Sequence, residues 1–428
     1  MSFIFGPWQG HGQINGTDGD DIIVAWGSDN TITDDGGNNL VISSAGGDDT
    51  LQLGPPTDRL LPLPPEGTPT LSNAVLLTGE GNTLIGGDAD FSILGLRGGN
   101  SINLGNGTNT LELLGTHNTV EVGRGDNAIE FLGSHASVIQ HGLAYGGAAG
   151  TTTIQFTGTG NSLNVLNDTP GNAGPALANV EITGGDGHGY FGFAGGGGFS
   201  LDTNGLYNEV YTGIGQFDIA PGDGHDTVHV GFSARGGGAN GTITLNGTHN
   251  TIDGSAGTVT VTGGDGYTTL DFSDGFSSGL HLALGGSHNS LTNNIPTGGT
   301  IDMGDGDASL SLFNNSATIT FDGSGNVATL DNANNGTIID QSDGLRLNVT
   351  GNPGIFSFTE TIQNFGADRG AVVALDAEAT GYATVQSAYA ALHADGMGNT
   401  VLDLPNDGEL VFAGLSPTAL HEDNFLIA

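Results

Sequence analysis

The chain has 428 residues, with 79 glycines and no cysteine, and its 46 acidic side chains against six basic ones give a formal charge of −40. This charge excludes nucleic acid as a partner and disfavours anionic membrane surfaces, because both are bound through cationic side chains. The absence of a Gly-X-Y period excludes collagen, and apolar residues at fixed intervals exclude a fully disordered chain. Such an acidic chain repels itself when compact, so bound cations are expected to neutralise part of its charge.

Residues 1–13 form an apolar N-terminal segment that contains Phe3, Ile4, Phe5 and Trp8. This segment lacks the basic region and the long apolar stretch of a secretory signal peptide. No apolar run elsewhere approaches the ~20 residues that span a membrane. We therefore expect neither an N-terminal secretory signal nor membrane insertion.

Residues 14–350 carry an internal repeat of nine residues. A second apolar row follows two residues behind the first, and apolar-x-apolar is typical of a short strand with one buried face. Glycine-rich turns of two alternating types separate the strands, so one coil holds two strands and about 18 residues. Stacked coils predict an all-β fold, a parallel β-solenoid with two facing sheets. The first row is clearest at Leu84, Ile93, Ile102, Leu111, Val120, Ile129 and Val138.

Two features modify this regular pattern. Residues 55–72 contain six prolines, which cannot hold ladder positions, so we expect an external loop there. The residue two before the first apolar row is often asparagine, whose amides can stack from coil to coil in a hydrogen-bonded ladder without metal. These asparagines are Asn30, Asn39, Asn82, Asn100, Asn109, Asn118, Asn127, Asn161, Asn250 and Asn289.

Some corners are acidic instead. Residues 16–24 and 222–228 resemble the nonapeptide Gly-Gly-x-Gly-x-Asp-x-apolar-x of the repeats-in-toxin family, which binds Ca²⁺. Calcium takes six to eight oxygen ligands, which turn carbonyls and aspartates supply. The resemblance implies Ca²⁺ as a cofactor, although asparagine replaces the family's aspartate in most coils. The expected ligands are Asp18, Asp20, Asp21, Asp48, Asp49, Asp223, Asp226, Asp265, Asp305 and Asp307.

Histidines recur in one type of corner, at His117, His135, His249 and His288. The spacing places His117 one coil from His135, so we expect one ring above the other. A stripe that binds transition metals is one interpretation. Turn histidines that face solvent or bond to the backbone are the interpretation that we favour.

Residues 351–428 depart from the repeat. We expect a strand and turn at 356–365, a helix at 384–393, and strands at 399–404 and 409–413. The segment resembles the C-terminus of repeats-in-toxin proteins in its Val-Leu-Asp-Leu, Leu-Val-Phe-x-Gly and Asp-Asn-Phe-Leu sequences. The resemblance implies a bacterial protein that a type I ABC-transporter system exports to the extracellular space. A domain that caps the last coil is the alternative, and both roles are compatible.

No catalytic residues are expected. The chain has no His-Glu-x-x-His helix, and the Gly-x-Ser-x-Gly match at residues 275–279 lies between strands without the helix that a nucleophile elbow requires. Carboxylates on the sheet faces leave open a solenoid enzyme that acts on polysaccharides. We expect a non-enzymatic structural protein that self-assembles head to tail into a filament, matrix fibre or surface layer. A soluble adhesin or glycan-binding protein is the alternative.

Overall fold

The computed structural model divides into two compact units, Met1–Gly222 and Asp223–Ala428, which are described separately. The residues that the structure describes are 1–43, 46–54, 72–141, 150–166, 179–193, 197–213, 215–231, 239–254, 257–272, 279–293, 298–313, 316–331, 335–351, 359–366 and 369–428. The expected external loop lies outside these residues, apart from Ser72, which begins a strand.

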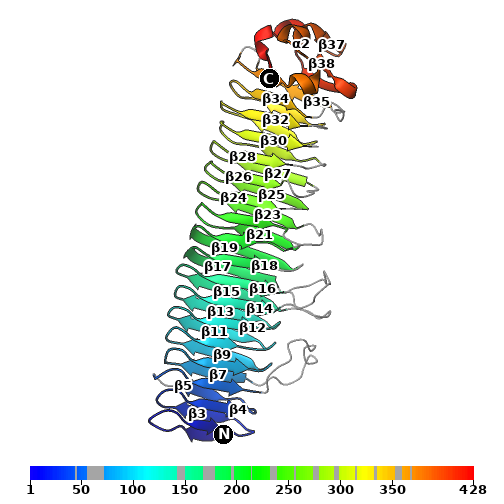
Figure 1. Cartoon of the computed structure of the whole chain (residues 1–428). Helices are drawn as coiled ribbons and strands as arrows, with labels where there is room; N and C mark the ends of the chain where they lie inside the picture. Colours follow the sequence, from blue (N-terminus) through cyan, green and yellow to red (C-terminus); the bar gives the residue numbers. More distant parts are fainter. Residues whose placement is uncertain are drawn as a thin grey trace. The chain divides into compact units, whose positions relative to one another are not determined.

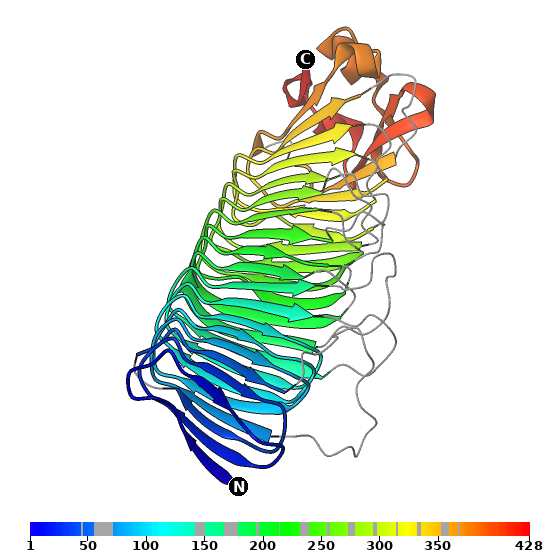
Figure 2. The same cartoon turned by 60° about the horizontal axis from the view of Figure 1, so that its bottom comes forward.

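Unit 1 is a parallel β-solenoid, as the repeat predicts. Odd-numbered strands pair in parallel in one sheet and even-numbered strands in the other (Figures 1 and 2). The odd strands are β1 Ser2–Phe5, β3 Asp21–Ala25, β5 Leu40–Ser43, β7 Ser72–Leu77, β9 Asp90–Gly95, β11 Asn109–Leu114, β13 Asn127–Leu132, β15 Thr151–Thr157, β17 Asn179–Gly187, β19 Gly198–Leu206 and β21 Gln216–Ala220. The even strands are β2 Gln13–Asn15, β4 Thr31–Asp34, β6 Thr50–Leu53, β8 Thr83–Gly86, β10 Ser101–Asn103, β12 Thr119–Val122, β14 Ser137–His141, β16 Ser162–Leu166, β18 Tyr190–Phe193 and β20 Glu209–Tyr211.

The core of unit 1 is built from the two apolar rows. Leu111 of β11 lies beside Ile129 of β13, and Val120 of β12 beside Val138 of β14, each 18 residues further along the chain. All four side chains are buried. Because strand side chains alternate between faces, the apolar-x-apolar pattern directs both rows inward and leaves the intervening residue outside. The predicted coil of 18 residues is therefore confirmed in this part of the solenoid.

Two unlike corners join the sheets. The first corner leads from an odd strand to the next even strand. In this corner a residue with positive φ is followed by a buried residue, as His117 (φ 62°) is followed by Asn118. The second corner leads from an even strand to the next odd strand, as residues 16–20 do between β2 and β3.

Asparagine ladders line both corners. In the first corner, the Nδ2 atoms of Asn82 and Asn100 donate to Oδ1 of Asn100 and Asn118, each over 3.0 Å. In the second, Asn109 Nδ2 donates to Asn127 Oδ1 over 2.8 Å. These side chains are buried, and the ladders satisfy most of the polar atoms that burial would otherwise leave without partners, although Asn109 Oδ1 accepts no hydrogen bond. The ladder prediction is confirmed at these positions.

Within unit 2, strands of like parity also pair in parallel, except in the C-terminal segment described below (Figure 1). Its even strands are β22 Thr227–Val230, β24 Thr251–Gly254, β26 Thr269–Phe272, β28 Ser290–Asn293, β30 Ser309–Phe313, β32 Val327–Asp331, β34 Arg346–Thr350, β36 Val372–Leu375, β38 Thr400–Leu404 and β40 Phe425–Ile427. Its odd strands are β23 Asn240–Leu245, β25 Thr258–Gly263, β27 Gly279–Leu284, β29 Thr300–Asp302, β31 Thr318–Phe321, β33 Thr337–Asp340, β35 Thr359–Gln363, β37 His393–Ala394 and β39 Gly408–Ala413.

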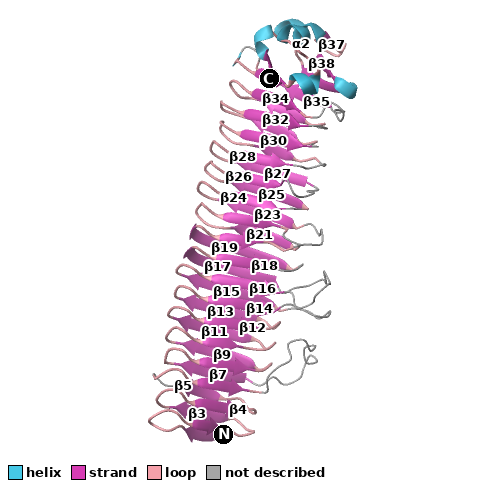
Figure 3. Cartoon of the chain, viewed as in Figure 1, coloured by secondary structure: helices cyan, strands magenta, loops and turns pink. Residues whose placement is uncertain are grey.

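The C-terminal segment covers the last coil of unit 2. Strands β39 and β40 pair in parallel with β35 and β36, whereas β38 pairs antiparallel with both β39 and β37. Helices α1 Ala377–Thr380 and α2 Val385–Ala391 lie in this segment (Figure 3), and α2 packs against β40. The expected helix and the first expected strand are present with slightly shorter bounds, and the second expected strand, β39, begins one residue earlier than expected.

Strands pair across both of the expected domain boundaries, at residues 13/14 and 350/351. Strand β1 pairs in register with β3, so solenoid pairing begins within the segment that we separated as residues 1–13. Strands β35 and β36 continue the pairing beyond residue 350. The sequence placed these boundaries at changes of composition, which do not mark the ends of a hydrogen-bonded ladder.

Candidate functional site

A buried carboxylate, that of Asp34, lies at a second corner of unit 1. It is not among the calcium ligands expected from the sequence. Asp34 ends β4, its side chain is 2% exposed, and its Oδ2 atom has no hydrogen-bond partner. The Gly36 N–H donates to its other oxygen over 3.2 Å. A Cβ atom on Gly16, one coil earlier, would lie 2.2 Å from Oδ2, so glycine is required beside this carboxylate.

The surroundings of Asp34 favour a bound cation. Burial raises the pKa of Asp34 to about 6; the hydrogen bond from Gly36 opposes this rise, and the charges of Asp21, Asp35 and Asp18 add to it. A divalent cation near Oδ2 would offset both the burial and the repulsion. Carboxylate and turn carbonyl oxygens are the ligands that Ca²⁺ prefers.

Asp21 has a different role in the same corner. The backbone N–H and hydroxyl of Thr17 donate to its Oδ2 over 2.6 and 2.8 Å, and the Ser2 N–H donates to its Oδ1 over 3.1 Å. Burial would raise the pKa of Asp21, but these hydrogen bonds hold it below its usual value. Its carboxylate therefore stabilises the turn of residues 16–20 as an anion.

The other ladder aspartates are also engaged in hydrogen bonds. Asp49 accepts from the backbone N–H of Asn30 over 2.8 Å and from the Ser43 hydroxyl over 2.6 Å. Asp226 accepts from the Gly224 N–H over 3.1 Å. Both side chains are buried, and both lie in the first corner, at the position that asparagine occupies in neighbouring coils.

The remaining expected ligands are exposed at corners. They do not form one site, because Asp18 and Asp20 lie in the second corner and the others in the first. No group of three or more His, Asp or Glu side chains within the described ranges is arranged to hold a metal ion. The exposed set is Asp18, Asp20, Asp48, Asp223, Asp265, Asp305 and Asp307.

A second buried carboxylate lies in unit 2. Glu360 of β35 is 1% exposed; its Oε2 accepts from the Gly336 N–H over 3.0 Å, and its Oε1 has no partner. Burial raises its pKa to about 7, although the hydrogen bond from Gly336 lowers it. Unlike at Asp34, no neighbouring charge contributes to this pKa shift. Glu360 is therefore expected to take up a proton and not to bind a cation.

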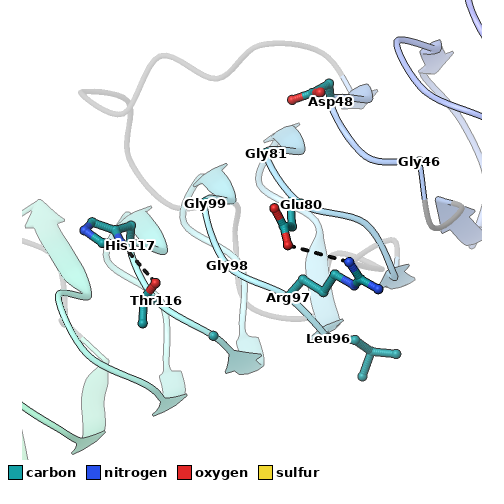
Figure 4. A pocket seen from close by; sticks show the side chains of 11 residues that line it. Gly46, Asp48, Glu80, Gly81, Leu96, Arg97, Gly98, Gly99, Thr116 and His117 are labelled. Atoms are coloured by element: carbon teal, nitrogen blue, oxygen red, sulfur yellow. Dashed lines mark hydrogen bonds and ion pairs between the residues drawn. The ribbon is translucent and has the colours of Figure 1, made fainter.

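An open groove of about 850 Å³ crosses the first corners of unit 1 (Figure 4). Gly81 and Gly99 line the groove. They occupy the corner position with positive φ, and because glycine has no side chain the groove is open there. Asp48 and His117 hold the same position at the two ends of the groove, and Glu80 and Arg97 form an ion pair of 3.6 Å across it. The groove is therefore polar and contains both charge signs.

Over the first five coils of unit 1, the outer face of the odd-strand sheet carries two rows of side chains that are apolar except for Ser92 of β9. The two rows cross this face in register, and none of their side chains is charged. Phe3 and Phe5 are each 65% exposed, and Leu40 is 39% exposed. At β11 the rows continue as Thr110 and Glu112, where the face becomes polar. We call this surface the apolar face: Phe3, Phe5, Ile22, Val24, Leu40, Ile42, Ala74, Leu76 and Leu94.

Comparison with known proteins adds no functional assignment. The chain matches no protein-family model, no curated protein and no solved structure. No helix in the described part of the chain has the length and apolar character needed to cross a membrane.

Proposed function

We propose that this chain is a calcium-stabilised structural protein of the bacterial extracellular space, which self-associates through the apolar face. The observation that carries the proposal is the apolar face itself. Outer positions of a solenoid strand normally face water, and Thr242, Thr244, Thr260 and Thr262 occupy such positions in unit 2. Exposed apolar patches of this kind mark interaction sites.

A second copy is the partner that fits this face. The face has no charge, whereas the chain carries −40, so contact elsewhere between copies is repulsive. Two flat sheets pack about 10 Å apart with interdigitated side chains, and identical faces have rows of identical spacing. Five coils and two rows cover roughly 350 Å², compared with ~800 Å² per partner in a stable complex. We therefore expect reversible association that depends on concentration.

Calcium supports this function in two ways. Bound at Asp34 and at the acidic corners, it offsets repulsion within the fold, and it screens repulsion between copies. Calcium is about millimolar outside cells, where weak sites fill. Export by a type I system is part of the proposal and is supported by the sequence resemblance of residues 351–428.

Sedimentation of the purified chain at millimolar calcium tests the proposal. We expect oligomers for the native chain and a monomer for the variant F3S/F5S/L40S, because each substitution removes an exposed apolar side chain. Ile4 is left unchanged, since it lies beside the buried Ile23 and points toward the core.

Leu132→Ser is the matched control. Leu132 is 37% exposed at the end of β13, outside the apolar face. Its replacement is expected to leave association intact. A native chain that sediments as a monomer at high concentration and millimolar calcium would contradict self-association through any surface, head-to-tail contact included.

A soluble adhesin or glycan-binding protein is the second candidate. Trp8 is 80% exposed and stacks on Trp26, with ring centroids 5.0 Å apart and planes 5° apart. Exposed stacked indoles are typical of surfaces that bind sugars or other flat ligands. Glycan binding by a strictly monomeric native chain, lost on Trp8→Ala, would favour this candidate.

A further inference from the structure

Aromatic rings stack along the first corner from coil to coil. In unit 1 the rings of His117 and His135 lie 5.1 Å apart with planes 7° apart. In unit 2 His225 and His249 lie 4.8 Å apart with planes 3° apart, and Tyr267 and His288 continue the stack. All of these residues occupy the positive-φ position and are exposed. The expectation that His117 and His135 lie one above the other is confirmed.

Hydroxyl groups orient three of these imidazoles, and one of the three is His288, whose Nδ1 lies 2.8 Å from Ser287 Oγ. His117 Nδ1 lies 3.0 Å from Thr116 Oγ1 (Figure 4), and His249 Nδ1 lies 2.9 Å from Thr248 Oγ1. When Nδ1 carries the proton and donates to the hydroxyl, Nε2 on the opposite side of the ring presents a lone pair. A hydrogen bond of this type orients histidines that bind metals.

We propose that the stacked pairs His117–His135 and His225–His249 each bind one divalent transition-metal ion, such as Zn²⁺, Ni²⁺ or Cu²⁺, between adjacent coils. Two nitrogens on one such ion lie at most about 4.2 Å apart, twice the metal–nitrogen distance. The stacked rings are nearly parallel, so their in-plane Nε2 lone pairs do not converge. Binding therefore requires both exposed rings to rotate about their side-chain torsions until the two Nε2 atoms face one ion. Water completes the coordination.

Calcium does not compete for these pairs, because it prefers oxygen ligands and imidazole suits zinc, nickel and copper. The field of a chain with charge −40 raises the local concentration of any cation. The metal would add a link between coils that are already joined by backbone hydrogen bonds, side-chain ladders and packing. This site is independent of the proposed self-association and of calcium binding.

Zinc uptake by the full chain, measured calorimetrically at pH 7.5 in excess calcium and 0.15 M salt, tests the proposal. We expect two ions per chain. The variants H117N/H135N and H225N/H249N should each lose one, and the quadruple variant should lose both. Asparagine is suitable because it tolerates positive φ.

His188→Asn is the matched control. His188 takes the same corner position, but its neighbours one coil away are Gly160 and Tyr207, so it has no histidine partner. Its replacement should leave uptake at two ions. Unchanged uptake in the quadruple variant, or an equal loss in His188→Asn, would overturn the proposal.

Copper bound to the native chain gives a test that needs no variant. We expect electron paramagnetic resonance to show coupling to imidazole nitrogens. A spectrum with oxygen ligands only would also overturn the proposal, since it would assign the metal to the acidic surface.

Discussion

At the scale of residues, the buried carboxylates of Asp34 and Glu360, each with an unpartnered oxygen, differ in what surrounds them. Asp34 lies among three other aspartates, whereas Glu360 lies where no neighbouring charge affects it. The same cost of burial therefore has different consequences. At Asp34 a cation can offset it, and at Glu360 a proton does.

Asp34→Asn is predicted to have opposite effects with and without calcium. The pKa of Asp34 in the folded chain is about 6, above the usual 3.8. Without calcium, ionisation of this group therefore lowers the free energy of unfolding as the pH rises from 3.8 through 6. In EDTA at pH 7.5, thermal melting should therefore show the variant to be more stable than the native chain. In millimolar calcium the order should reverse, because asparagine removes the anionic ligand. A variant that is less stable in both conditions would contradict the assignment of Asp34 to calcium.

Glu360→Gln is predicted to remove a dependence of stability on pH. The folded pKa of about 7 exceeds the usual 4.5, so the native contribution is fully present below pH 4.5 and is lost as the pH passes 7. The difference of about 2.5 units corresponds to about 3 kcal/mol. Urea unfolding at pH 5 and 8 should show the variant gaining by this order relative to the native chain. The exposed Glu112, changed to Gln, should show no such gain.

The sequence was sufficient to predict the buried rows and ladders, because the nine-residue period fixes which side chains point inward. The same period held a signal for Asp34, which stands two residues after Ile32 in the inward row. Three of the aspartates chosen as ligands, Asp21, Asp49 and Asp226, matched a motif position. That position in the fold is a hydrogen-bonded ladder, which aspartate and asparagine both fit.

At the scale of elements, the C-terminal cap is held by its pairing with the last coil. Phe412 of β39 and Phe425 of β40 are buried, and Phe412 packs edge-on against Phe365. The helix and strands of this segment were predictable from local patterns. Their order in the sheets was not, because β40 and β39 return to the solenoid from far along the chain.

The proposed export role of this segment can be tested separately from a role as a cap. Residues 351–428 fused to an unrelated carrier should be secreted by a bacterium with a type I system, and deletion of residues 355–428 should abolish secretion of the native chain. Secretion is measured by the protein in the medium relative to that in cells. A carrier that stays inside, together with a truncated chain that still reaches the medium, would leave the segment with the cap role only.

The apolar face is formed by the register of successive odd-numbered strands. The sequence pattern placed Phe3, Ile4 and Phe5 together in one apolar N-terminal segment. The nine-residue period marks only the side chains that point into the core, so it does not distinguish Ile4 from the two phenylalanines. The register separates them: Ile4 faces the core, and the two phenylalanines continue the outward rows of Ile22 and Val24. Runs of consecutive apolar residues, such as Leu40, Val41 and Ile42 in β5, were the available signal.

At the scale of the whole molecule, charge limits stability. With 46 acidic and six basic residues, each unit folds against its own repulsion, and the ladders and apolar rows supply the opposing free energy. A cation that binds only the folded chain adds RT ln(1 + [L]/Kd), about 2.7 kcal/mol at a hundredfold excess over Kd. Calcium is therefore expected to have a large effect on a chain of marginal stability.

Calorimetric melting of the full chain in EDTA and in millimolar calcium, with equal magnesium as the control for charge screening, tests the central claim most directly. The account predicts a melting temperature several degrees higher in calcium than in EDTA, and a smaller rise in magnesium, which demands a stricter octahedral geometry. Identical melting in EDTA and in excess calcium would contradict it, and the asparagine ladders and apolar packing would then be the only support of the fold.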